Sequence, residues 1–147
     1  MKNDERKLRS FLDPIVLSTL PHFFTLGLVV YSTQLSFIFV LYSVVVFIST
    51  TLSIVWHLQF ERKTVWFWLD YTFAFLWTLI EFFLAFEFHI MQTIILLNVV
   101  VFVLNQVCEY AVYGRYYDQL HSIWHLISSV KAAYVAHLIL SRRINKN

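Results

Sequence analysis

The sequence predicts an all-α integral membrane protein, a bundle of about five transmembrane helices that forms a single domain over residues 1–147. Hydrophobic residues make up 59% of the chain and charged residues only 14%, whereas soluble domains are about 45–50% apolar and about 25% charged. Long apolar runs recur along the chain without the alternation of apolar and polar residues that strands show. A soluble domain of this length could not cover so much apolar surface.

Each predicted span has about the length that a bilayer requires. A hydrocarbon core about 30 Å thick needs about 20 helical residues. In chain order, the predicted spans cover residues 14–33, 35–58, 64–86, 88–108 and 117–140. A polar N-terminal segment, residues 1–13, precedes them, and a basic tail, residues 141–147, follows them.

The local sequence supports each span in turn. The first span contains Pro21 and His22 and is the least regular of the five. The second ends with "STTLSIVWHL", and the third starts with "TVWFWLDYTF" after the short polar connection "QFERK". The fourth is the apolar run "FHIMQTIILLNVVVFVLNQVC". Gly114 suits the turn before the fifth span, because glycine tolerates the backbone angles that tight turns need.

The distribution of charge predicts the orientation in the membrane. Five spans place the two termini on opposite sides. The N-terminal side carries Lys2, Arg6, Lys7, Arg9, Arg62, Lys63 and Arg115, and the other side carries Arg142, Arg143 and Lys146. Because cytosolic loops are enriched in lysine and arginine, we expect a multi-pass protein with a cytosolic N-terminus. The net charge of +2 gives no reason to expect a nucleic-acid partner.

Five polar side chains within the spans are expected at one membrane depth. Ser53 and His57 lie near the end of the second span, Asp70 lies about two turns into the third, and His121 and His125 lie in the first turns of the fifth. The direction of each span puts these positions on the N-terminal side of the membrane. Residues four apart share a helix face, and polar groups inside membranes are costly and usually functional or paired.

This combination of residues predicts a zinc site. Three neutral imidazoles with an open fourth position are the ligand set of a catalytic zinc ion, here His57, His121 and His125. Zinc would lower the pKa of a bound water toward about 7 and supply a nucleophile. Asp70 could accept the proton, and Ser53 could hydrogen-bond the water or the developing oxyanion. Two alternatives stay open: histidines that only join helices, and a haem held between membrane histidines.

Three segments together resemble a known family. "STTLSIVWHL", "WLDYTFAF" and "LHSIWHLISSVKAAY" are similar to the three motifs of the CREST superfamily of membrane zinc hydrolases, which includes the alkaline ceramidases, the progestin and adipoQ receptors and GPI-lipid remodelling factors. Its pattern is SxxxH late in one helix, aspartate early in the next and HxxxH in the last. "HSIWH" is most similar to the alkaline ceramidases.

The resemblance implies specific roles and an activity. His57, His121 and His125 match the zinc ligands, Asp70 matches the aspartate that activates water, and Ser53 matches the serine beside the zinc. It further implies hydrolysis of an amide or ester bond in a membrane lipid. A metal-stabilised, non-catalytic receptor or interaction protein is the alternative, and a homo-oligomer that completes the lipid cavity stays open.

Other polar residues are expected to join helices. Glu81 and Lys131 each lie deep in their spans, about 20–25 Å from the N-terminal face at 1.5 Å per residue. We predict that they form a buried ion pair, although separate, unpaired positions are the alternative. His22 is expected to satisfy backbone groups freed by the preceding proline, and Asn98 to hydrogen-bond between helices. Asp118 is predicted to cap the fifth span, with a contact to an imidazole as the alternative.

Overall fold

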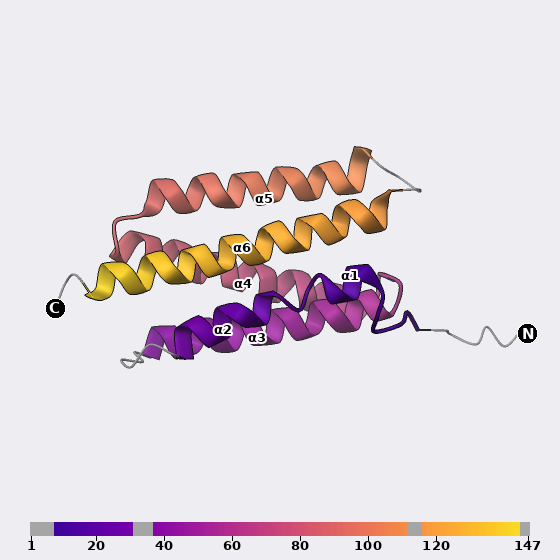
Figure 1. The fold of residues 1–147 in the computed structure, drawn as a ribbon, viewed down its shortest axis with the longest axis horizontal. Helices are drawn as coiled ribbons and strands as arrows, with labels where there is room; N and C mark the ends of the chain where they lie inside the picture. The colour runs from indigo at the N-terminus through magenta and orange to yellow at the C-terminus, as the bar shows by residue number, and fades with distance from the viewer. Residues whose placement is uncertain (1–7, 31–36, 112–115, 145–147) are drawn as a thin grey trace, which may run out of the picture.

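The computed structural model describes residues 8–30, 37–111 and 116–144, which form a helical bundle. The helices are α1 (Pro14–Leu17), α2 (His22–Val30), α3 (Phe37–Leu58), α4 (Val65–Glu87), α5 (Met91–Ala111) and α6 (Tyr117–Ile144). No strand occurs among the residues described, so the predicted all-α class is confirmed. The long helices lie along one another and alternate in direction, and α1 and the C-terminal end of α6 lie at opposite ends of the bundle (Figure 1).

Four helices correspond to the second to fifth predicted spans. α3, α4, α5 and α6 each contain an apolar stretch of 18 to 25 residues, long enough to cross a membrane. Their ends differ from the predicted ends by at most four residues. This arrangement fits a multi-pass membrane protein. The orientation stays a prediction, and several of the basic residues behind it (Lys2, Arg6, Lys7, Arg115 and Lys146) lie outside the described residues.

The prediction of one continuous first helix was wrong. α1 ends at Leu17, and α2 begins at His22 after a break that contains Pro21. A proline ring clashes with the carbonyl four residues earlier and supplies no N–H, and here that earlier residue is Leu17, the last of α1. The hydroxyls of Ser18 and Thr19 donate to carbonyls of α1 at 2.8 and 2.7 Å. Both short helices run beside α3 (Figure 1).

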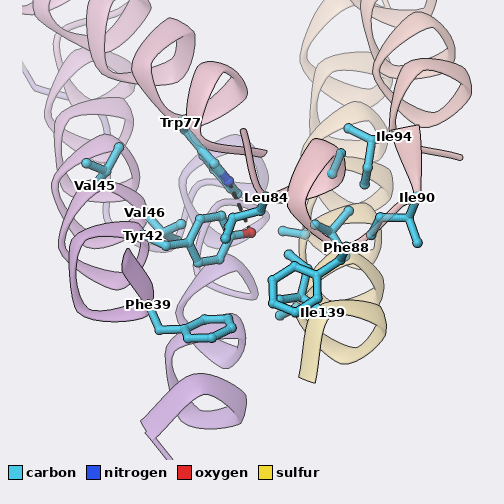
Figure 2. Packing of buried hydrophobic residues seen from close by; sticks show 14 residues of the cluster. Phe39, Tyr42, Val45, Val46, Trp77, Leu84, Phe88, Ile90, Ile94 and Ile139 are labelled. Carbon is cyan, nitrogen blue, oxygen red and sulfur yellow. Dashed lines mark hydrogen bonds between the residues drawn. The ribbon is translucent and has the colours of Figure 1, made fainter. Parts of the chain in front are cut away.

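An apolar core fills the half of the bundle at the start of α3 and the end of α6. Its fully buried members include Phe39 and Tyr42 of α3, Leu84 of α4 and Ile139 of α6. Figure 2 shows these side chains converging between the helices, with the Trp77 indole N–H donating to the Tyr42 hydroxyl at 3.2 Å. Burial of this apolar surface fixes the four long helices at one end, and the polar side chains lie toward the other.

The predicted ion pair between Glu81 and Lys131 is confirmed. Lys131 Nζ lies 2.6 Å from Glu81 Oε2, and the side chains are 8% and 0% exposed. Asn98 completes the contact, since its Oδ1 accepts from Lys131 Nζ at 3.2 Å and its Nδ2 donates to Glu81 Oε2 at 3.3 Å. One residue from each of α4, α5 and α6 contributes, so Asn98 joins helices as expected. Each buried charge depends on its partner for compensation.

Removing either charge should therefore destabilise the bundle to a similar extent. We expect Glu81→Gln and Lys131→Met each to lower the free energy of unfolding by about 3–5 kcal/mol, because either substitution leaves the remaining charge buried without its partner. The double variant should lose clearly less unfolding free energy than the two single variants lose together. Unfolding by SDS in mixed micelles measures all three. If one single variant lost much of its stability and the other lost little, the mutual dependence of the two charges would be contradicted.

Candidate metal centre

Three buried histidines meet where α3 ends and α6 begins. His57 lies in the last turn of α3 and is 0% exposed. His121 and His125, one turn apart on α6, are each 3% exposed. The chain direction explains the meeting, since α3 and α5 run toward this end of the bundle and α4 and α6 start from it (Figure 1). The structure thus brings together the three residues expected to bind zinc.

The three rings are close enough to hold one ion. One ligand atom from each ring lies within 4.8 Å of those of the other two. The ring centroids are 5.1 Å apart for His57 and His121, and 4.8 Å apart for each of the other pairs. Two nitrogen ligands of a tetrahedral zinc ion, each about 2.0–2.1 Å from the metal, lie about 3.3 Å apart. Modest side-chain rotations would bring all three nitrogens onto one ion.

Unpaired nitrogen atoms in this cluster also fit a metal. Both ring nitrogens of His121 are fully buried and have no hydrogen-bond partner among the residues that the structure describes. A buried polar group without a partner costs about 1–3 kcal/mol. His57 Nε2 and His125 Nε2 lie 2.8 Å apart, so one of them donates to the other. A cation would give all three rings a partner at once, and the three histidines therefore could hold a metal ion.

Glu61 orients His57. Its Oε1 lies 3.0 Å from His57 Nδ1, so the carboxylate accepts the Nδ1 proton and leaves Nε2 facing the other rings. Burial alone would raise the pKa of the Glu61 carboxyl, but hydrogen bonds from His57 and Tyr117 and the electrostatic influence of His57 and His121 lower it overall. The carboxylate therefore stays ionised, the form in which it accepts from an imidazole.

A strained turn carries Glu61 to that position. Phe60 and Glu61 both have φ of 55°, in the left-handed region that costs non-glycine residues about 1–2 kcal/mol. The Glu61 N–H donates to the Trp56 carbonyl at 3.3 Å and closes the turn onto α3. Arg9 covers the same end, because its N–H donates to the Leu58 carbonyl at 2.8 Å and its guanidinium lies over the Phe60 ring.

Ser53 and Asp70 reach a cavity beside the histidines. The cavity has a volume of about 140 Å³, and its lining includes Ser53 of α3, Asp70 of α4 and His125 of α6. Asp70 is 8% exposed and forms no hydrogen bond with a described residue. Ser53 lies one turn before His57. The predicted aspartate and serine thus share a cavity with one histidine of the cluster, while His57 and His121 lie next to it.

The cavity also contains polar residues that the sequence did not assign to the site. His22, Asn98 and Lys131 belong to its lining. Glu61 was missed because it lies in the connection after α3, where no helical pattern applies. The sequence feature that could have identified Glu61 is its position four residues after His57. At that spacing the two side chains would share a face if the helix continued past Leu58. His22 Nδ1 bonds a backbone carbonyl at the break, that of Thr19 at 3.0 Å, although this carbonyl also accepts from the His22 N–H and is not the one that Pro21 leaves without a donor. The ring also lines the cavity.

Asp118 does not cap α6. The helix begins at Tyr117, which places Asp118 inside its first turn. Its carboxylate accepts from both terminal nitrogens of Arg9, at 3.2 and 3.3 Å. The predicted cap was therefore wrong, because Tyr116, whose carbonyl accepts from the Leu120 N–H at 3.0 Å, is the residue that precedes the helix. The Arg9 contact ties the N-terminal segment to α6 beside the histidines.

Comparisons with known proteins identify no relative. No family model matches the sequence, and no curated protein or solved structure matches it. The resemblance to the CREST superfamily stays a prediction from three short segments.

Metal content tests the cluster directly. The purified protein should contain about one metal ion per chain, and His121→Ala/His125→Ala should lose it, because two of three ligands are removed. Elemental analysis after purification without chelators gives the stoichiometry. His137→Ala, at an exposed position of α6, is the matched control and should keep the metal. A folded parent protein without metal would show that these histidines only pack.

Glu61 variants test the orientation of His57. Glu61→Ala should weaken metal affinity about 10- to 100-fold, the usual effect of losing a carboxylate that holds a ligating histidine. Glu61→Gln keeps an oxygen that accepts from Nδ1, so its loss should be smaller. Competition with a chelator of known affinity measures both, and Glu87→Gln at the exposed end of α4 is the control. Equal affinity in the parent and the alanine variant would contradict the assigned role.

Proposed function

We propose that this chain is a zinc-dependent intramembrane hydrolase that cleaves an amide or ester bond of a membrane lipid. The observation that carries the proposal is a cluster of three buried histidines that adjoins a cavity lined by Asp70 and Ser53. Histidine-only ligand sets with an open position are typical of catalytic rather than structural zinc. The resemblance to the CREST superfamily, and to its alkaline ceramidases in particular, supports the same activity.

The histidines, Asp70 and Ser53 would have different roles in hydrolysis. Once bound to His57, His121 and His125, zinc would supply Lewis-acid chemistry and a nucleophile near neutral pH. Asp70 is buried in the cavity with no hydrogen bond to a described residue, so its carboxylate is free to take a proton there. The Ser53 hydroxyl lines the same cavity and can donate to a substrate oxygen as negative charge develops on it.

The size and surroundings of the cavity favour a lipid substrate. A volume of about 140 Å³ accommodates a small polar group but not an acyl chain. Val101 of α5 and Ala74 of α4 also line the cavity, and both helices expose large apolar side chains such as Phe75 and Phe102. A lipid could place its scissile bond in the cavity and its chain along these apolar surfaces. With the N-terminus in the cytosol, the reaction would occur on the cytosolic side.

The geometry disfavours a haem. A bis-histidine haem needs its iron and macrocycle between two imidazoles. His57 Nε2 and His125 Nε2 lie only 2.8 Å apart, which leaves no room for a porphyrin between them. The third ring, His121, lies against both. Three convergent rings suit a single small ion better than a planar cofactor.

Asp70→Asn tests the hydrolase proposal. It should reduce cleavage of lipid amides or esters about 10²- to 10⁴-fold, the usual effect of losing a general base, with metal content unchanged. Mass spectrometry of lipids incubated with the purified protein measures the products. Asp118→Asn is the matched control, since that carboxylate is exposed and is held by Arg9.

Two results would count against hydrolysis. One is a metal-loaded parent protein that cleaves neither lipid amides nor esters, and the other is Asp70→Asn with the activity of the parent. Metal binding without cleavage, together with full function of Asp70→Asn in cells, would favour the metal-stabilised receptor or interaction protein.

A further inference from the structure

His22 is a fourth buried imidazole beside the metal centre. It opens α2 after the break at Pro21 and is 5% exposed. Its Nδ1 lies 3.0 Å from the Thr19 carbonyl oxygen. A carbonyl only accepts hydrogen bonds, so Nδ1 carries the ring proton. In the neutral ring, Nε2 is therefore left as a hydrogen-bond acceptor.

The His22 ring faces the cavity without belonging to the metal cluster. It lines the cavity with Ser53 and Asp70. It packs edge-on against His125 and Trp77, with ring centroids 6.1 and 5.6 Å away. The group of ligand atoms within 4.8 Å of one another does not include His22. No described residue hydrogen-bonds its Nε2, although a buried imidazole gains from a partner.

The lysine and the indole N–H groups of the cavity already have hydrogen-bond or ion-pair partners. Lys131 is neutralised by Glu81 at 2.6 Å and also donates to Asn98. The indole N–H groups of Trp77 and Trp124 donate to the Tyr42 hydroxyl and the Val101 carbonyl. Apart from the metal ligands and the hydroxyls of lining residues such as Ser49, Ser53 and Ser128, this leaves the Asp70 carboxylate and His22 Nε2 as the acceptors without a described partner. Asp70 has a role in the proposed reaction, so His22 is available for a donor on the substrate.

We propose that His22 is a specificity-determining residue, which accepts a hydrogen bond through Nε2 from a donor at the scissile group of the lipid. This inference rests on the proposed function. A secondary amide carries such an N–H, whereas an ester or a tertiary amide of the same acyl chain does not. Sites that hydrogen-bond a substrate donor discriminate strongly against analogues that lack it, because the buried group is then left unpaired. His22 thus selects secondary amides.

Three substitutions separate this role from a structural one. His22→Asn places a side-chain N–H near the position of Nδ1 and preserves the bond to the Thr19 carbonyl. His22→Gln reaches further and places its carbonyl oxygen near the position of Nε2. His22→Phe keeps a ring against Trp77 and His125 and removes both polar groups. Metal content and SDS unfolding of each variant show whether the metal site and the fold are intact.

The measurement is binding of two fluorescent lipids to the purified protein in detergent. One is an N-acyl amine with a secondary amide, and the other is its N-methylated form. The parent should bind the secondary amide about 5- to 10-fold more tightly, the effect of one hydrogen bond. His22→Phe and His22→Asn should lose this preference, and His22→Gln should retain most of it.

Several results would overturn the role of His22. These are a parent protein that binds both lipids equally or neither, a preference that survives in His22→Phe, and rescue by asparagine but not by glutamine. Analysis of the recovered lipids for cleavage keeps the two proposals apart. If the secondary amide binds in a way that depends on His22 but is not cleaved, only the hydrolase proposal would be contradicted. Cleavage that is indifferent to His22 would sink only the role of His22.

Discussion

The hydrogen-bonding needs of three buried imidazoles are the constraint on which the structure at this end of the bundle depends. Three buried rings meet there, and both nitrogens of His121 have no hydrogen-bond partner among the described residues. His57 and His125 hydrogen-bond each other, and the Glu61 carboxylate accepts from His57 Nδ1. That contact requires two consecutive residues in the left-handed region. A cation would resolve the remaining deficit, and for that reason we interpret the strained turn as support for a metal site.

A second group of polar side chains lies on the side of the cavity away from the histidine cluster. Glu81, Asn98 and Lys131 join α4, α5 and α6 between the histidines and the apolar core. α5 exposes most of its large apolar side chains, and Asn98 attaches it to the bundle through this group. The cavity lies between the two groups and is lined by residues of both, including His125 and Lys131. The elements that stabilise the bundle therefore also shape the space in which a substrate would lie.

The sequence predicted the parts that depend on span length and direction. Twenty-residue apolar runs fixed the four long helices, and the alternation of their directions placed His57, Asp70 and His121 at one end. It could not predict the features that depend on a break or a turn. The division at Pro21 follows from a steric clash with Leu17, but which way the His22 ring would then face is decided by packing against Trp77 and His125. Similarly, Glu61 reaches His57 only through a turn that its residue types do not favour.

The charges around the cavity restrict the chemistry of a substrate. A phosphate or carboxylate group buried in this cavity would need an unpaired cation to compensate its burial. Lys131 is the cation of the lining, and Glu81 already neutralises it at 2.6 Å. Arg9, near the histidines, is held by Asp118 and Asp13. The metal would then carry the net positive charge facing the cavity, with Asp70 to balance it. A neutral scissile group with a single hydrogen-bond donor suits this balance better than an anionic headgroup placed at the same depth.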